Sequence, residues 1–304
     1  MSLNTLFQKT KILVNALTGI LYKWSIDMGI MTIPPLKSDN SLIVSLTSYG
    51  RRVESCVYYT LVSLLRQSEQ PSRIVLWLSE HEWNDSILPK KILTLRDKNV
   101  EIRYCKDLRS YKKLLPTLAL YPESTVITVD DDVMYSPDTI ASLLKAHVLY
   151  PYDIICLNAA YPIINNQGFP QQYHLWEKCD VTCSGRILFP IGAGSILYPA
   201  HSLHPDVIKE ELFTKLCPHA DDIWFWFCGL RKNTNKQFIN KRGKDLSFDA
   251  LYQYLHNGSA LSHSNRSEHQ NDRQFHALFN YYREALDNNG NLYDVGYSIM
   301  DEKK

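Results

Sequence analysis

The sequence lacks several features that would place a protein quickly in a class. Its 304 residues carry 33 basic and 32 acidic side chains, so the formal net charge is only +1. Charge balanced in this way creates no global field that favours nucleic acid or a strongly acidic partner. No stretch supplies the roughly 18 consecutive apolar residues that a membrane span requires. The composition, 45% hydrophobic and 21% charged, is that of a globular protein able to bury a sizeable core.

The seven cysteines do not form a disulfide framework. Their number is odd, and they are spread over the whole chain. The nearest pair, Cys179 and Cys183, has no matching second pair of the kind that a zinc site needs. We therefore expect reduced thiols, mostly in the core, of a cytoplasmic protein.

Residues 1–36 form an amphipathic segment that differs from the rest of the chain. No small-residue cleavage site follows its apolar residues, so a secretory signal is not expected. A helix packed on its own domain and a helix lying in the plane of a membrane surface both fit the pattern. Pro34 and Pro35 end the segment. Its apolar residues near helical spacing are Leu6, Phe7, Leu13, Val14, Leu17, Ile20, Leu21 and Trp24, with Lys9, Lys11 and Lys23 among them.

From residue 41, short apolar runs alternate with segments whose apolar residues follow helical spacing. This alternation predicts an α/β fold with a mostly parallel sheet and helices on both faces. Beyond residue 160 the pattern loosens, which predicts an irregular C-terminal half. The expected strands are 41–49, 73–79, 100–105, 125–129 and 153–158, and the expected helices are 53–67, 88–97, 111–121, 136–150, 218–232 and 271–286.

Three adjacent carboxylates follow the fourth expected strand, in "VITVDDDVMYSP" (126–137). They repel one another and lose hydration near a protein interior. A hard divalent cation such as Mg²⁺ or Mn²⁺ would offset this charge at the strand end, where ligands of such sheets bind. If the chain stays extended, Asp130 and Asp132 project to one side and Asp131 to the other. An acidic loop that caps the next helix is the alternative, although Ser136 and Pro137 already suit that capping role.

Two further roles of the acids can be tested by comparing the sequence with known motifs. A calcium loop beginning at Asp130 is excluded, because Tyr135 and Ala141 stand where glycine and glutamate are required. A phosphatase-type hydrolase could use Asp130 and Asp132 as nucleophile and acid. Met134 occupies the place where such phosphatases carry threonine or valine, which disfavours this reading without removing it.

Five segments, in order, resemble nucleotide-sugar-dependent glycosyltransferases of the GT-A fold from bacterial polysaccharide synthesis. A bare Asp-x-Asp motif is weak, whereas the ordered series, covering roughly residues 40–230, is specific. The resemblance implies a GT-A fold, with a single catalytic domain over 37–304 that includes a C-terminal helix. The segments are "IVSLTSYGRRV" (43–53), "SLLRQSEQPSRIVLWLSE" (63–80), "EIRYCKDLRSYKKLLPTL" (101–118), "VITVDDDVMYSPDTI" (126–140) and "LHPDVIKEELFTKLCPHADDIWFW" (203–226).

The resemblance implies roles for residues on the donor side. Asp130 and Asp132 match the acids that bind Mn²⁺ or Mg²⁺, and Asp131 would lie near the ribose or sugar. His263 or His269 could add a metal ligand. The residues expected near the nucleotide are Thr47, Ser48, Tyr49 and Arg51, with Asp107 near the base. Lys112 and Lys113 could reach a phosphate group, or alternatively they could lie on a solvated face of a helix.

In inverting members of the family, an acid in the place of "ADDIW" deprotonates the acceptor hydroxyl. Asp222 is the favoured base and Asp221 is nearly equal to it, while helix capping is the plainer role of Asp221. Trp224 and Trp226 would offer aromatic surface on which a sugar ring can stack.

The implied activity is a metal-dependent, inverting glycosyltransferase, a hexosyltransferase that uses a UDP-sugar. Its acceptor would be a glycan or a lipid-linked glycan, with no nucleic-acid partner. We expect a cytoplasmic enzyme with peripheral contact at the cytoplasmic face of the inner membrane. A phosphatase-type hydrolase and a non-catalytic carbohydrate-binding protein of the same fold remain the alternatives.

Overall fold

The computed structural model describes residues 3–36, 41–163, 165, 170–241, 245–248 and 270–287. The chain divides into two compact units, which are described one at a time. The first comprises residues 1–108, 130–141 and 242–260, and the second comprises residues 109–129, 142–241 and 261–304. A single catalytic domain over 37–304 stays a prediction.

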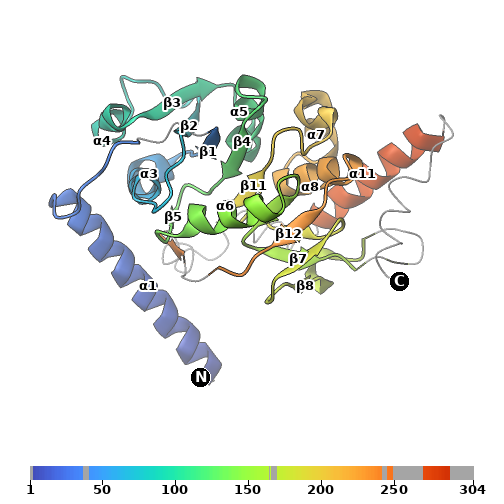
Figure 1. Ribbon diagram of the computed structural model, residues 1–304, viewed down its shortest axis with the longest axis horizontal. Coiled ribbons are helices and arrows are strands. Elements are labelled where there is room, and N and C mark those ends of the chain that lie inside the picture. The colour runs from blue at the N-terminus through green and yellow to red at the C-terminus, as the bar shows by residue number, and fades with distance from the viewer. Residues whose placement is uncertain are drawn as a thin grey trace. The chain divides into compact units, whose positions relative to one another are not determined.

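The first unit contains three parallel strands in the order β3-β2-β1 (Figure 1). The sequence explains why they pair, because β1 ("LIVSLT") and β2 ("RIVLWLS") are nearly continuous apolar runs, as expected of strands covered on both faces. Ile43 lies opposite Arg73, and Ile74 lies opposite Val100. The bounds are β1 (Leu42–Thr47), β2 (Arg73–Ser79) and β3 (Val100–Cys105).

Two short helices follow β1 where one helix over 53–67 was predicted. The helix is interrupted at Cys56, whose φ and ψ of −127° and −53° lie outside the helical region. Gly50 precedes the first helix with a φ of +49°, a conformation that glycine adopts without steric cost. The helices of this unit are α1 (Leu3–Asp27), α2 (Arg51–Ser55), α3 (Val57–Leu65), α4 (Lys90–Leu93) and η1 (Thr94–Lys98), and β5 (Val133–Met134) pairs antiparallel with β13 (Leu246–Ser247).

The second unit has strands in the order β4-β11-β6-β12-β9. β6 and β12 run parallel, whereas the other neighbours pair antiparallel. Both units combine strands with helices, which confirms the predicted α/β class, and the parallel pairs β1–β2, β2–β3 and β6–β12 agree with the predicted mostly parallel sheet. The bounds are β4 (Thr125–Thr128), β6 (Ile154–Cys156), β9 (Cys183–Gly185), β11 (Ile196–Tyr198) and β12 (Lys236–Phe238), and a small antiparallel sheet joins β7 (Ala159–Tyr161), β8 (Glu177–Lys178) and β10 (Phe189–Pro190).

The core of the second unit is aromatic and centres on helix α8 (Asp221–Arg231). Nine of its eleven residues are buried, and Trp226 packs against Phe275 of α11 (Gln270–Asp287) at 5.6 Å between ring centroids. These two helices confirm those predicted over 218–232 and 271–286. The remaining helices are η2 (Arg109–Lys113), α5 (Leu115–Leu120), α6 (Thr139–Leu149), η3 (Tyr173–Leu175), η4 (Pro205–Ile208) and α7 (Glu210–Leu216).

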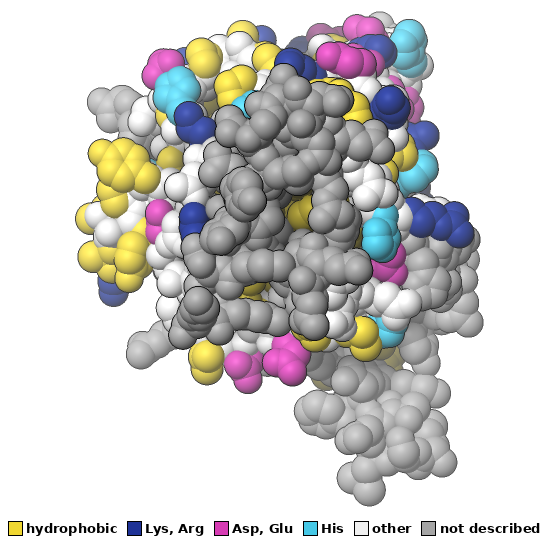
Figure 2. Space-filling model, turned by 90° about the vertical axis from the view of Figure 1, so that its right-hand side faces the viewer, with side chains coloured by type: hydrophobic (Ala, Val, Ile, Leu, Met, Phe, Trp, Pro, Cys, Tyr) yellow, Lys and Arg dark blue, Asp and Glu magenta, His cyan; other side chains and the backbone are white. Residues whose placement is uncertain are grey.

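The seven cysteines all lie in described parts of the chain, and none forms a disulfide. Four of them are buried, as expected for core thiols. Among the described helices, none has the length and hydropathy to cross a bilayer. On the face shown in Figure 2, acidic and basic side chains are interspersed, in keeping with the balanced charge of the sequence.

Candidate active site

The acid cluster at residues 130–132 lies in a turn. Strand β4 ends at Thr128, and residues 131 and 132 turn before β5 begins at Val133. The predicted alternation of an extended strand therefore does not hold here. Asp131 and Asp132 are both buried, with 4% and 7% of their surface exposed.

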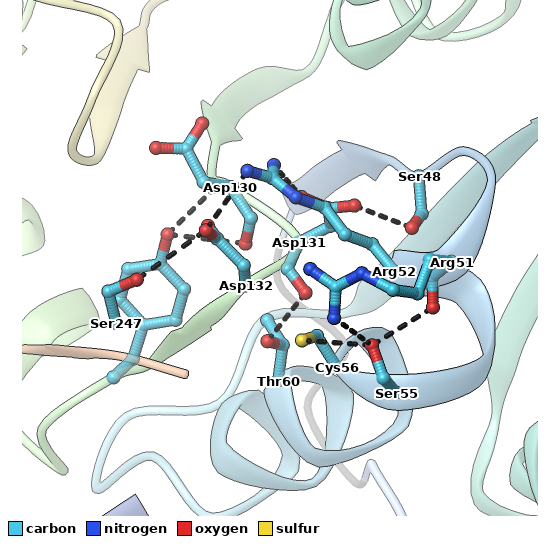
Figure 3. A network of polar contacts seen from close by, with 11 residues as sticks. Ser48, Arg51, Arg52, Ser55, Cys56, Thr60, Asp130, Asp131, Asp132 and Ser247 are labelled. Atoms are coloured by element: carbon cyan, nitrogen blue, oxygen red, sulfur yellow. Dashed lines mark hydrogen bonds and ion pairs between the residues drawn. The ribbon is translucent and has the colours of Figure 1, made fainter. Parts of the chain in front are cut away.

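Arg52 of helix α2 bridges two of the three acids. One guanidinium nitrogen lies 3.0 Å from Asp131 Oδ1, and the other lies 3.3 Å from Asp132 Oδ2. Figure 3 shows this guanidinium between the two carboxylates, while the carboxylate of Asp130 extends away from it. Arg52 thus joins Asp131 with Asp132, and the metal-binding pair of Asp130 and Asp132 stays a prediction.

Hydrogen bonds hold Asp131 in addition to its ion pair with Arg52. Ser48 Oγ donates to Asp131 Oδ2 at 2.5 Å, and Thr60 Oγ1 donates to the backbone carbonyl of Asp131 at 2.9 Å. Burial raises the pKa of Asp131 to about 6, and the attraction of Arg52 limits that rise. The carboxylate is therefore mostly ionised at pH 7 and depends on Arg52 for compensation.

The segment 245–248 closes against the same turn. The backbone N–H of Phe248 donates to the carbonyl of Asp132 at 2.7 Å, and Ser247 Oγ contacts Asp132 Oδ2 at 3.5 Å. Asp245 Oδ1 accepts a hydrogen bond from the backbone N–H of Ser136 at 2.8 Å. The acid turn is thus fixed by residues more than 100 positions away in the sequence.

The other residues predicted around the nucleotide in this unit have varied surroundings. Thr47 Oγ1 donates to the carbonyl of Trp77 at 2.9 Å. Tyr49 is half exposed, and its ring lies 5.7 Å from the guanidinium carbon of Arg52. Asp107 is exposed in the loop after β3.

Arg51, which the sequence singled out, is exposed and contacts Ser55 Oγ at 3.3 Å. Successive helical residues point about 100° apart, so Arg51 and Arg52 cannot both face the acids. Arg52 is the residue that sequence reasoning missed. The adjacent arginines in "YGRRV" were the available signal, but the letters alone could not choose between them.

A second acid pair opens helix α8 in the second unit. Asp221 Oδ2 lies 3.0 Å from Lys113 Nζ. Asp222 accepts hydrogen bonds from the backbone N–H of Ile223 at 3.0 Å and of Gly192 at 3.4 Å. A Cβ added at Gly192 would lie 3.3 Å from Asp222 Cβ and 3.5 Å from Lys113 Nζ, so a glycine permits this close approach.

Asp222 has the protonation behaviour that a general base needs. Its pKa is raised to about 6, because burial and then the neighbouring Asp221 raise it by more than Lys113 and the two backbone hydrogen bonds lower it. Asp222 is then ionised at pH 7 and is a stronger base than an ordinary aspartate, whose pKa is near 3.9.

Two expectations about this second centre are corrected. Lys112 and Lys113 are buried, so the alternative of a solvated helix face is wrong. Trp224 and Trp226 are also buried, and their indole N–H groups donate to the carbonyls of Val207 and Ile187. They are core residues without a face open to a sugar ring, because α8 is apolar nearly all round.

The carboxylate chemistry of the first cluster suits Mg²⁺ or Mn²⁺. The three adjacent acids place several hard carboxylate oxygen atoms in one turn, and such oxygens are the ligands that Mg²⁺ and Mn²⁺ prefer. Within the described residues, no group of three or more His, Cys, Asp or Glu side chains has the geometry of a metal site. Oxygen atoms of a ligand such as a diphosphate would have to complete the coordination, as is usual for Mg²⁺. His263 and His269 lie outside the described residues.

Replacing Arg52 with Gln should destabilise the protein by about 2–3 kcal/mol at pH 8, because buried carboxylates lose their partner. Without Arg52, the folded-state pKa of Asp131 rises further above its unfolded value, so stability falls as pH rises. The loss should therefore be smaller at pH 5, which urea unfolding at both pH values measures. Arg51→Gln, at an exposed neighbour, should change stability by less than about 0.5 kcal/mol. An equal loss in both variants would contradict the bridging role of Arg52.

No family model matches the chain, and no curated protein matches it in sequence. Among solved structures, it is similar to S. aureus TarS 1–349 in complex with UDP, at 14% identity and a TM-score of 0.44, over 70% of this chain and 63% of that one. The match thus spans less than two thirds of that TarS chain. It is also similar to TarS with UDP-GlcNAc, at 14% identity and a TM-score of 0.41 over 67% and 59% of the two chains. A UDP-glucose pyrophosphorylase from Acinetobacter baumanii matches at 10% identity and a TM-score of 0.42 over 75% and 95%. TM-scores below 0.5 establish no shared function, so the chain's own residues must support one.

Proposed function

We propose that this protein is a metal-dependent glycosyltransferase that moves a sugar from a nucleoside-diphosphate donor to a glycan acceptor with inversion. The observation that carries the proposal is the acid turn, in which the carboxylates of Asp131 and Asp132 are buried, share Arg52 and directly follow Asp130. A transferase of this kind needs such a site, because its leaving group is itself a diphosphate that requires a cation.

On the donor side, Asp132 and Asp130 would hold the cation. A bound Mg²⁺ or Mn²⁺ supplies Lewis-acid stabilisation of the departing diphosphate. Asp131 was predicted near the ribose or sugar, but its burial and its bonds to Ser48 and Arg52 favour a positioning role. The residues proposed to contact the nucleotide remain Thr47, Ser48, Tyr49 and Arg51, with Asp107, Lys112 and Lys113 as predictions for the base and phosphate.

On the acceptor side, Asp222 would take the proton of the acceptor hydroxyl. The hydroxyl oxygen then forms a bond to the anomeric carbon while the bond from that carbon to the diphosphate oxygen breaks. Asp221 would position Lys113, whose charge keeps Asp222 ionised at neutral pH. The substrates we propose are a UDP-hexose and a glycan or lipid-linked glycan, at the cytoplasmic face of the inner membrane.

A thermal-shift screen of nucleoside diphosphates and nucleotide sugars, with and without Mn²⁺, tests the proposal. A ligand that binds only the folded state raises the melting temperature. Stabilisation by one nucleotide, and only with metal, would support the transferase. No response to any nucleotide would favour the hydrolase or the sugar-binding protein instead.

Lys113→Met should shift the acid limb of the pH–rate profile upward. Lys113 lowers the pKa of Asp222, so its removal leaves Asp222 protonated to higher pH. We expect activity about three-fold or more below wild type at pH 6 and close to wild type at pH 8. Lys145→Met, an equal charge change at an exposed residue of α6, should leave the profile in place. A uniform loss at every pH would contradict electrostatic tuning by Lys113.

A further inference from the structure

Helix α1 has two apolar faces, and one of them packs against its own unit. Tyr22 stacks on Phe248 at 6.0 Å between ring centroids, and a Cβ on the buried Gly19 would lie 3.3 Å from the Phe248 ring. Ile26 is 5% exposed. Lys23 donates to the carbonyl of Ser55 at 2.6 Å. This face fulfils the expectation of a helix packed on its own domain.

The opposite face of α1 is a continuous exposed stripe. Each of its side chains is more than half exposed, and the helical ones lie within about 60° of the direction of Leu17 at 100° per residue. We call these residues the α1 stripe: Leu13 (56%), Val14 (55%), Leu17 (60%), Ile20 (58%), Leu21 (64%), Trp24 (54%) and Met28 (62%). Scattered exposed apolar residues are normal, whereas a contiguous set marks an interaction surface.

The width of the stripe favours a lipid surface over a partner helix. A two-stranded coiled coil uses a narrow seam of residues three and four apart, flanked by charged positions. In α1, Val14 and Leu21 lie beside that seam and widen the apolar face to about 120°, which is typical of a helix lying in a membrane interface. Trp24 adds a side chain suited to the boundary between headgroups and acyl chains.

The charge of α1 favours an anionic surface. The helix carries Lys9 and Lys11 besides Lys23, which is held toward the protein by Ser55, and its sole acidic residue is Asp27 at its last position. The carboxylate of Asp27 accepts a hydrogen bond from Tyr59 Oη at 2.7 Å, so it is held toward the protein. A basic helix that exposes an apolar face binds membranes that contain anionic lipid.

We infer that the α1 stripe docks the protein in the plane of an anionic phospholipid bilayer. The helix lies along the surface with the stripe among the acyl chains near the headgroups and its packed face toward the protein. This inference rests on α1 alone, so it holds or fails independently of sugar transfer.

Flotation of the full-length protein with vesicles tests the inference. The vesicles are equal parts phosphatidylglycerol and phosphatidylcholine, or phosphatidylcholine alone. Wild-type protein should float with the anionic vesicles and much less with the neutral ones. Leu17→Glu should reduce the bound fraction roughly tenfold or more, because a Leu side chain leaves the apolar phase and a charge would enter it.

Thr18→Glu is the matched control, since it makes the same charge change at the next residue, which is exposed beside the stripe. It should bind nearly as wild type, and both variants should melt as wild type. Absence of flotation, or equal flotation of Leu17→Glu, would overturn the inference. Equal binding to both vesicle types would remove its charge component. A wild-type dimer in sedimentation velocity that Leu17→Glu dissociates would assign the stripe to a second copy instead.

Discussion

Asp132→Ala should lose the metal-dependent stabilisation by nucleotide while keeping the fold. Asp132 lies in a turn after β4, and its carboxylate contacts Arg52 and Ser247 without joining the apolar core. At a ligand concentration one hundred times Kd, binding contributes about 2.7 kcal/mol, which corresponds to roughly 4–5 °C in a protein of this size. The thermal shift with Mn²⁺ and the preferred nucleotide should fall from that range to near zero.

Asp138→Ala is the control for this experiment. Asp138 is an exposed carboxylate six residues further along the same unit. Its removal should leave the thermal shift intact. If Asp132→Ala still responds to metal and nucleotide as wild type does, the acid turn is not the donor site. If Asp132→Ala melts far below wild type without ligand, its role is structural.

Asp222→Asn should reduce kcat by about 10²–10⁴-fold while leaving the nucleotide-induced thermal shift unchanged. Asparagine keeps the size of the side chain and removes only its ability to accept a proton as a base. In the wild-type protein, activity should fall as pH drops through about 6, because Asp222 then takes up a proton. The residual activity of Asp222→Asn should lack this dependence.

Asp221→Asn separates the two neighbouring acids. Asp221 pairs with Lys113, so its loss should alter the pH profile and reduce kcat less than the loss of Asp222. A larger loss in Asp221→Asn than in Asp222→Asn would exchange their roles. Loss of the thermal shift in Asp222→Asn would mean that this residue serves donor binding.

The strands of the first unit could be predicted from the sequence because short, nearly continuous apolar runs are typical of strands buried on both faces of a sheet. "RIVLWLS" became β2 with the predicted bounds, and "VEIRYC" became β3. The predicted helix over 53–67 was broken at Cys56, which its apolar spacing could not show. Hydrophobic periodicity reports which face is buried, and it does not report a local backbone break.

The acid cluster could be located from the sequence, but its geometry could not. The turn at residues 131 and 132 replaced the expected extended exit and brought two carboxylates to Arg52. The contact from Ser247 depends on β13 pairing with β5 across more than 100 residues. Local spacing holds no information on such a pairing.

The two tryptophans of α8 illustrate a different error. "ADDIWFWFCGL" was interpreted as acids beside an exposed aromatic surface. A helix that is apolar on every face is buried, and this signal was present in the letters. Acids at the start of such a helix are then buried with it, which is also why burial raises the pKa of Asp222.

A phosphorus NMR time course of the wild-type protein with Mg²⁺ and a panel of nucleotide sugars tests the central claim most directly. Water or an added glycan can accept the sugar, and the products show which bond breaks. The proposal predicts that one nucleotide sugar is consumed, that free nucleoside diphosphate appears, and that EDTA stops the reaction. Formation of a nucleoside monophosphate with a sugar phosphate, release of inorganic phosphate, or no consumption of any donor would contradict it.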